Sequence, residues 1–402
     1  MSRTRLFGAL CGHAFLVNFA RVVMAPLVAV FIATFGVGEG TAGLVVSAVW
    51  VGSALPRVPT GYLLTRLTRL QVVLMAGGIL AVGATLTAVA TNVPALILGA
   101  GVMGLASGLY FVTGNTLVSE LFPRRVGRML GIHGTANQVA AVIAAPAITF
   151  ALAIGADWSA LFAALGVPAG EEWRAVFLAL AAAALALTVA TSLVARGTDL
   201  PDAGSEDRDL LGAVRAEWRT VFFGLAVMGT VGFAWQGVFN FYVLFAESRG
   251  LSPSMARNAL TVVFAAGIPA FAISGRLADR LPQPAYLLGI AASFVLLLVG
   301  LTAVRTVAGL FVASAVIGYV VHSLFPALDT FLLGALPDHN RASAYSVYSG
   351  AMMLAQAPGS WFVGTLVEAG FGYVAVFRAF ALVLGIVVAV LLVLHRRGRL
   401  PS

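Results

Sequence analysis

The sequence predicts an all-α polytopic membrane protein in which twelve transmembrane helices form two parallel six-helix repeats. Three observations lead to this fold class. The chain has 402 residues, of which 60% are hydrophobic and only 10% are charged, and its mean hydropathy is +0.99. Long apolar runs follow one another with short polar connections between them. One short polar phrase also occurs twice, once in each half of the chain.

The composition excludes most classes of soluble protein. A soluble domain carries about 25% charged residues, so this chain cannot cover its surface with polar groups and must be solvated partly by lipid. All 24 basic residues are arginines, and the formal net charge is +8. In a soluble protein this charge would suggest nucleic acid, but arginines at the ends of membrane helices set orientation instead. We therefore expect a lipid bilayer and no nucleic acid as partners.

Apolar runs of about 20 residues predict membrane spans, because a helix of that length crosses the hydrocarbon and satisfies its own backbone hydrogen bonds. The first run contains Asn18 and Arg21 and is longer than a signal peptide, so we expect a retained helix. The strand-like alternation of a membrane barrel is not seen. We predict spans at residues 6–35, 41–64, 70–91, 94–121, 129–155, 173–195, 219–246, 253–277, 285–304, 306–335, 342–368 and 372–395.

One connection is longer and more polar than the others. Residues 196–218 are rich in Pro, Gly, Ser and acidic residues, and they divide the spans six to six. This linker separates an N-terminal six-helix bundle at residues 1–195 from a C-terminal six-helix bundle at residues 219–402. Residues 207–218 are expected to form a helix on the membrane surface.

The placement of arginine predicts the orientation in the membrane. With a cytoplasmic N-terminus, seventeen arginines fall in cytoplasmic segments and four in outer segments. The positive-inside rule therefore predicts a cell-membrane protein with both termini and the linker in the cytoplasm. At the cytoplasmic end of the fourth span, Glu120 is expected to pair with Arg124 and Arg125. The four outer arginines are Arg174, Arg249, Arg257 and Arg305.

The repeated phrase joins the second and third spans of each half. Residues 60–70 read TGYLLTRLTRL, and residues 274–284 read SGRLADRLPQP, so that Gly61 is equivalent to Gly275. Arg66 is likewise equivalent to Arg280, but the acid Asp279 has Thr65 as its counterpart. The second copy is therefore the one that carries a negative charge.

The constant offset between the two copies of the phrase extends well beyond it. No gap is needed between residue 31 and residue 123, which favours duplication of a six-helix unit. An even number of spans in each copy makes the two copies parallel. The matched pairs include Phe31 with Phe245, Gly36 with Gly250, Phe111 with Phe325, Asn115 with Asp329, and Pro123 with Pro337.

With these features the chain resembles the major facilitator superfamily. Members of that family have six plus six helices, a long central loop and the motif Gly-x-Leu-x-Asp-Arg between the second and third helices of each half. The second copy of the phrase matches the motif fully, whereas the first lacks the acid. The motif residues are Gly61, Thr65, Arg66, Gly275, Asp279 and Arg280.

The resemblance implies that each copy of the motif is half of a cytoplasmic latch. Its acid would lie against the N-terminus of a helix from the other half, where a carboxylate gains about 0.3–1 kcal/mol. Asp279 is then expected near Arg128, and Thr65 near Arg341. Because only Asp279 is charged, the latch would be asymmetric. The alternative is a solvated loop charge that has no part in gating.

The resemblance also implies that the first, fourth, seventh and tenth spans line a central cavity. Polar side chains are costly in lipid, so those in these spans are candidates for contact with a substrate or with one another. Asn18 and Arg21 are one turn apart and share a helix face. The substrate-binding candidates are Asn18, Arg21, Tyr110, Asn115, Trp235, Gln236, Asn240 and His322.

Arg21 is the most specific of these signals because it lies near the middle of its span, too deep to reach the membrane surface easily. It needs an anion, which is either a protein carboxylate or a substrate. Asp329 is the carboxylate that we place well inside a span, so a structural Arg21–Asp329 pair and an anion-binding arginine are both open. Asp329 and His322 are also candidates for proton coupling, with hydrogen-bonded packing as the alternative.

Motifs of other functional classes are missing from the sequence. A chain without lysine has no Walker-type phosphate loop. It has neither a His-Glu-x-x-His motif nor a pair of cysteines, and no Gly-x-Ser-x-Gly motif. We therefore expect no enzyme activity, no catalytic residue, no metal and no cofactor.

The resemblance implies a secondary transporter that moves a small solute by alternating access, and we expect a monomer. Arg21 favours an organic anion as the substrate. One alternative is an exporter of lipophilic compounds, suggested by the aromatic Trp50, Trp235 and Phe239, although the fifth span lacks the Gly-Pro-x-x-Gly-Gly ending of the family's antiporters. An alternative of another class is a membrane sensor or scaffold on the same fold, since a fold does not fix a function.

Overall fold

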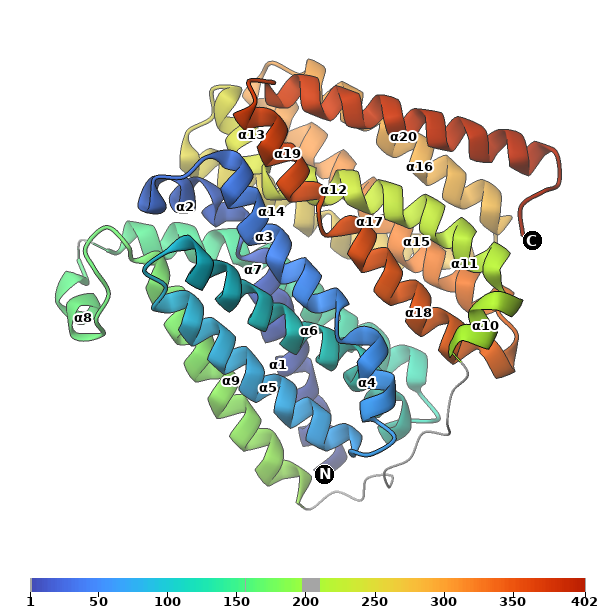
Figure 1. Ribbon diagram of the computed structural model, residues 1–402, viewed down its shortest axis with the longest axis horizontal. Helices are drawn as coiled ribbons and strands as arrows, with labels where there is room; N and C mark the ends of the chain where they lie inside the picture. Colours follow the sequence, from blue (N-terminus) through green and yellow to red (C-terminus); the bar gives the residue numbers. More distant parts are fainter. Residues whose placement is uncertain (1, 156, 197–209, 402) are drawn as a thin grey trace. The chain divides into compact units, whose positions relative to one another are not determined.

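The computed structural model describes residues 2–155, 157–196 and 210–401, with the side chains of residues 2 and 338–342 left aside, and every regular element among them is helical (Figure 1). The chain divides into two compact units. The first contains Met1–Val37 and Leu44–Asp207, and the second contains Gly38–Gly43 and Arg208–Ser402.

The N-terminal unit is a bundle of long helices with one short helix at its edge. Trp173 and Tyr110 are its largest fully buried side chains. Its elements are α1 (Ser2–Val22), the 3-10 segment η1 (Ala25–Leu27), α2 (Val28–Phe35), α3 (Glu39–Ala54), α4 (Arg57–Leu63), α5 (Arg69–Ala88), α6 (Val93–Leu121), α7 (Val126–Ala153), α8 (Ser159–Ala164) and α9 (Trp173–Ala195).

The C-terminal unit contains more breaks in its helices. Its elements are α10 (Leu210–Ala216), α11 (Trp218–Gly224), the π segment η2 (Leu225–Gly229), α12 (Thr230–Asn240), α13 (Tyr242–Ser248), α14 (Pro253–Ala265), α15 (Gly267–Ala278), α16 (Gln283–Ala303), α17 (Val307–Ala335), α18 (Asp338–Gln356), α19 (Gly359–Glu368) and α20 (Tyr373–Arg396). Of the predicted linker helix at 207–218, the part within the described residues contains α10 and the first residue of α11.

The described residues contain eleven helical stretches that are long and apolar enough to cross a membrane. They correspond to every predicted span except the eleventh, at residues 342–368. That span is occupied by α18 and α19, which are separated at Ala357 and Pro358. The sequence of α18 is rich in Ser, Tyr and other polar residues. The protein is therefore a multi-pass membrane protein of the predicted all-α class.

The two units repeat the same helices at the predicted offset, which is the one that relates Gly61 to Gly275. α6 and α17 both contain 29 residues, and they begin and end at equivalent positions. α3 and α14 begin at Glu39 and Pro253, which are also equivalent. Each repeat has a left-handed glycine before this helix, Gly36 with a φ of 62° and Gly250 with a φ of 92°. The predicted repeat is therefore present in the backbone.

Side-chain caps fix where α6 and α17 begin. The side chain of Asn92 accepts a hydrogen bond from the backbone N–H of Ala95 at 2.9 Å, and Thr306 accepts one from Gly309 at 3.1 Å. A polar side chain at this position satisfies a backbone donor that the first turn of a helix leaves free. Asn92 and Thr306 are equivalent positions of the two repeats, so the cap is repeated together with the helix.

Glycine allows the second and fourth spans of each unit to approach closely. A Cβ atom on Gly104 of α6 would lie 2.2 Å from the carbonyl oxygen of Val49 in α3. At the equivalent place, a Cβ atom on Gly318 of α17 would lie 2.2 Å from the carbonyl oxygen of Val263 in α14. Small residues give this backbone contact in membranes, where helix association depends on packing because lipid is as apolar as the side chains.

The ion pair of Glu120 differs from the predicted one. Glu120 Oε1 lies 2.9 Å from Nη2 of Arg69, at the beginning of α5, and not against Arg124 or Arg125. The prediction was wrong because the chain turns immediately after α6, where the N–H of Arg125 donates to the carbonyl of Phe122. α5 and α6 are packed side by side, which brings Arg69 to the end of α6.

Candidate functional site

Arg21, near the C-terminal end of α1, is buried between two aromatic rings. Its exposed fraction is 8%, and its guanidinium carbon lies 4.7 Å from the ring centroid of Trp50 and 4.8 Å from that of Phe111. These distances allow cation–π attraction. Among the described residues of its own unit, Arg21 has no carboxylate partner, and its buried Nε makes no hydrogen bond. A buried charge without a counter-ion is unfavourable, so this environment favours the arrival of an anion.

Asn18 holds the guanidinium in this position. Its Oδ1 accepts a hydrogen bond from Nη2 of Arg21 at 2.6 Å, and its Nδ2 donates to the backbone carbonyl of Asn137 at 2.7 Å. The predicted shared face of Asn18 and Arg21 is therefore a direct contact. The side-chain Oδ1 of Asn137 in α7 is buried and has no hydrogen-bond partner among the described residues. Asn137 therefore anchors Asn18 through its backbone carbonyl and has an unsatisfied side-chain oxygen.

Tyr110 packs between two histidines, and sequence reasoning did not identify the first of them. The ring centroid of Tyr110 lies 5.8 Å from those of His13 and His133. Its hydroxyl donates to the carbonyl of Leu10 and lies 2.8 Å from Nε2 of His133. A hydroxyl has one proton, so the imidazole donates in the second bond. Tyr110 is fully buried here and joins α1, α6 and α7; its contact with a substrate stays a prediction.

The equivalent residues Asn115 and Asp329 are both exposed, on α6 and α17. Asp329 Oδ1 accepts a hydrogen bond at 2.7 Å from the hydroxyl of Tyr345, which lies on the next helix, α18. Asp329 belongs to the C-terminal unit and Arg21 to the N-terminal unit, and their pairing stays a prediction.

His322 lies in an aromatic cluster of the C-terminal unit. Its Nδ1 donates to the carbonyl of Gly318 at 2.7 Å, and its ring centroid lies 5.8 Å from Trp235 and 5.7 Å from Phe264. Phe271 and Phe325 are within 6.3 Å and 6.2 Å. The exposed fraction of His322 is 5%. The imidazole is therefore enclosed by apolar rings on several sides.

The repeat places different chemistry at equivalent positions. Trp235 is the counterpart of Arg21 in the second repeat, and Phe264 is the counterpart of Trp50. In the C-terminal unit the two rings meet edge to face at 6.4 Å, where the N-terminal unit has a guanidinium over an indole. The N-terminal unit therefore has a charged side chain, Arg21, where the C-terminal unit has an aromatic one, Trp235.

Gln236 and Asn240 form a buried polar network with Ser360 of α19. Nδ2 of Asn240 donates to Ser360 Oγ at 2.8 Å and to the carbonyl of Gln236 at 3.0 Å. Ser360 Oγ also donates to that carbonyl at 3.0 Å. Oδ1 of Asn240 is buried without a hydrogen-bond partner among the described residues. Ser360 was not predicted, because nothing in the sequence indicates which face of α19 meets α12.

In the first copy of the motif the side chains fold back on their own turn. Thr65 Oγ1 donates to the carbonyl of Tyr62 at 2.8 Å, and Arg66 donates to the Tyr62 hydroxyl at 2.5 Å. A Cβ atom on Gly61 would meet nothing within 4 Å, so packing does not require a glycine there. The predicted neighbour of Thr65, Arg341, lies outside the described side chains.

The second copy leaves its acid exposed. Asp279 is the C-cap residue of α15, and its backbone N–H donates to the carbonyl of Gly275. Its carboxylate makes no hydrogen bond or ion pair with a described residue of its own unit. Arg280 is exposed as well, and a Cβ atom on Gly275 would meet nothing within 4 Å. The gating role of both copies stays a prediction.

No group of three or more His, Cys, Asp or Glu side chains that could hold a metal ion occurs in the described part of the chain.

A sequence model of the family described as "Major Facilitator Superfamily" matches the chain in two overlapping segments, residues 10–304 and 225–402. The chain belongs to the major facilitator superfamily. The predicted resemblance is therefore confirmed, and the protein is a membrane transporter of this superfamily. A search of curated proteins gives no match.

Solved structures of other members have the same fold. A bacterial homologue of the human lysosomal transporter Spinster, in an inward-facing and unoccupied conformation, aligns with a TM-score of 0.82 and 18% sequence identity, covering 98% of this chain and 97% of that chain. The inward-facing and occupied conformation of such a homologue aligns with a TM-score of 0.79, at the same identity and coverage. At this identity the likeness establishes the superfamily fold.

Proposed function

We propose that this protein is a secondary active transporter that carries a small organic anion across the cell membrane by alternating access, with Arg21 as the residue that binds the anion. The protein would lie with both termini in the cytoplasm, as the arginine distribution predicts. The first, fourth, seventh and tenth spans would line the route, and coupling would be to protons through Asp329 or His322.

One observation carries the choice of an anion. Arg21 is 8% exposed, and its guanidinium lies between the rings of Trp50 and Phe111 and has an unsatisfied Nε. A planar guanidinium binds a carboxylate or phosphate through two parallel hydrogen bonds. Asn18 accepts from Nη2 of this group, and Nε is the buried donor that no described residue uses. The aromatic rings on each side would exclude water and strengthen that contact.

Stabilisation by ligands tests this proposal. The purified protein would be heated with a series of organic carboxylates and phosphates, neutral solutes and lipophilic cations. A ligand at 100 times its dissociation constant stabilises a protein by about 2.7 kcal/mol, which is readily measured. We expect stabilisation of the unmodified protein by part of the anion series and its loss in Arg21→Ala. Arg21→Lys should recover only part of it, because an ammonium lacks the planar pair of donors.

Arg5→Ala is the matched control, since Arg5 is an exposed arginine of the same helix. It should respond to the anions as the unmodified protein does. Equal stabilisation of all the proteins by lipophilic cations, with no response to anions, would contradict the proposal. That outcome would favour an exporter of lipophilic compounds, for which the aromatic cluster of Trp235, Phe264 and His322 would be the binding surface.

The latch gives a second prediction. Asp279→Asn removes the charge but keeps the shape, and we expect it to shift the equilibrium between inward-open and outward-open forms by up to about fivefold, because a carboxylate at a helix N-terminus contributes about 0.3–1 kcal/mol. Distances between spin labels at the ends of α6 and α17 would report the two populations. Thr65→Asp should shift them in the opposite direction. If both variants leave the populations unchanged, the motif acids have no gating role.

A further inference from the structure

A pocket lies at one end of the N-terminal unit, where α2, α5 and the beginning of α9 meet the chain that follows α8. Its volume is about 370 Å³, which is large enough for a small ligand or a lipid head group. Phe35, Val89, Leu165 and Leu178 supply apolar walls. The charged residues in the wall are Glu171 and Arg174. The pocket therefore combines apolar surface with one acid and one base.

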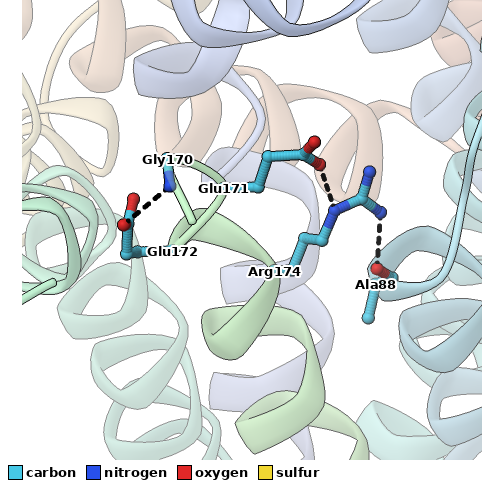
Figure 2. Close-up of polar contacts among 5 residues, drawn as sticks. All are labelled: Ala88, Gly170, Glu171, Glu172 and Arg174. Carbon is cyan, nitrogen blue, oxygen red and sulfur yellow. Dashed lines mark hydrogen bonds and ion pairs between the residues drawn. The ribbon is translucent and has the colours of Figure 1, made fainter. Parts of the chain in front are cut away.

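Glu171 and Arg174 contact each other, but this contact leaves one polar atom of each side chain without a hydrogen bond. Nε of Arg174 donates to Oε2 of Glu171, and Nη1 donates to the carbonyl of Ala88 at 2.6 Å (Figure 2). The ring of Trp173 lies 4.6 Å from the guanidinium carbon. Oε1 of Glu171 and Nη2 of Arg174 make no hydrogen bond to any described residue. In Figure 2 these two free atoms lie on the same side of the pair.

The free atoms are an acceptor and a donor with opposite formal charges, and they belong to the two groups that the Nε–Oε2 contact joins. Arg174 is 7% exposed, so its orientation is fixed by packing and by the Ala88 carbonyl. A ligand that carries only an anion would meet the carboxylate of Glu171, and one that carries only a cation would meet the guanidinium. A zwitterion satisfies both, with its anion on Nη2 and a hydrogen-bonding ammonium on Oε1.

The surface beside the pocket is apolar. Trp158, Leu161 and Leu165 are spaced i, i+3 and i+7 along α8 and its ends, and their exposed fractions are 50%, 46% and 53%. Phe162 is buried and fixes the helix to the unit. α8 lies between two membrane spans, α7 and α9, at the edge of the unit (Figure 1). Tryptophan and an exposed apolar helix face between two membrane spans are typical of the membrane interface.

We propose that this pocket binds the head group of a phosphatidylethanolamine molecule, with the phosphate on Arg174 and the ammonium on Glu171. The acyl chains of the lipid lie along the apolar face of α8, formed by Trp158, Leu161 and Leu165. Leu165 contributes both to this face and to the pocket wall, so one amphipathic molecule covers both. The site is separate from Arg21 and does not depend on the identity of the transported solute.

Native mass spectrometry of the full-length protein in detergent tests the site. Equal amounts of phosphatidylethanolamine, phosphatidylglycerol and phosphatidylcholine would compete for the protein. We expect at least tenfold more retained phosphatidylethanolamine than either competitor, because phosphatidylglycerol lacks the ammonium and the quaternary ammonium of phosphatidylcholine cannot donate a hydrogen bond. Arg174→Gln should lower the retained phosphatidylethanolamine at least tenfold.

Glu171→Gln keeps the size of the side chain and should remove the preference for phosphatidylethanolamine over phosphatidylglycerol, even if Arg174→Gln fails to fold. The matched control is Glu172→Gln, which removes the same charge from the neighbouring residue, whose Oε1 instead accepts from the N–H of Gly170 (Figure 2). It should leave the preference unchanged.

Three results would overturn the proposal. Equal retention of the three lipids would show that the head group is not recognised. A preference that survives Glu171→Gln would place recognition elsewhere. Stabilisation by soluble phosphoethanolamine, lost in Glu171→Gln but without selective retention of lipid, would show that the pocket takes a soluble zwitterion instead.

Discussion

Replacing Gly104 by alanine is expected to lower the free energy of unfolding by roughly 3 kcal/mol, and leucine at this position is expected to prevent folding altogether. The single added carbon atom would lie 2.2 Å from the carbonyl oxygen of Val49 and 2.9 Å from the Cα atom of Gly52. Backbone atoms cannot rotate away as a side chain can. α3 and α6 would therefore have to separate along their whole contact.

The repeat gives the same prediction a second time. Gly318→Ala places a carbon atom 2.2 Å from the carbonyl oxygen of Val263, so it should cost a similar amount in the C-terminal unit. Heating the detergent-solubilised variants and measuring the remaining monodisperse protein by size-exclusion chromatography would rank them. The two substitutions should lower the temperature of half-loss by similar amounts, because equivalent backbone contacts are removed.

Two other glycines on the same helices are the matched controls. A Cβ atom on Gly101 of α6 would have its nearest neighbour at 4.0 Å, and one on Gly334 of α17 would have none within 4 Å. Alanine at these positions should be neutral or stabilising, since alanine favours a helix over glycine by about 1 kcal/mol. If Gly104→Ala and Gly101→Ala behave alike, the close approach of α3 and α6 does not contribute to stability.

The fold was predictable because its signals are local and repeated. The span pattern follows from hydropathy, and the positions of Gly36 and Gly250, or of Asn92 and Thr306, follow from local backbone chemistry and recur at one offset. The eleventh span was harder to delimit because it is polar in its first half and is broken at Pro358.

The candidate site was predictable only in part. That Arg21 is buried beside Asn18 follows from helix spacing, but its partners Trp50 and Phe111 come from α3 and α6, and no local pattern specifies which face of those helices it meets. The pair of Arg69 with Glu120 was missed for the same reason, since it depends on how α5 packs on α6. Contacts between helices are set by packing along their whole length, which one sequence does not reveal.

The pair of Arg174 and Glu171 differs from these contacts between helices. The two residues are three positions apart, so their contact is local, but the pocket around them is formed by α2, α5 and the chain after α8. Their spacing allows an ion pair on one helix face, and only the fold shows that the pair belongs to a cavity wall.

Asp329→Asn is expected to abolish the response of transport to an imposed pH gradient. Asp329 is exposed on α17 and accepts a hydrogen bond from Tyr345, so both of its chemical requirements for proton exchange are met: access and a defined neighbour. Asparagine can accept the same hydrogen bond but cannot take up a proton. The substitution therefore removes proton exchange at this position while the hydrogen bond from Tyr345 can be kept. Proteoliposomes containing a pH dye would report proton movement when the most strongly stabilising organic anion is added.

Tyr345→Phe is the matched control because it removes the hydrogen bond and leaves the carboxylate. It should keep proton movement, with at most a changed rate, whereas Asp329→Asn should show none while still exchanging the anion between the two sides. Retention of proton movement in Asp329→Asn would contradict the assignment to Asp329. The second candidate, His322, would then be tested by His322→Gln. His322 is enclosed by Trp235, Phe264 and Phe325, unlike the exposed Asp329. An imidazole in that position exchanges protons only when the rings around it separate, so coupling through His322 would require the aromatic cluster to open in every transport cycle.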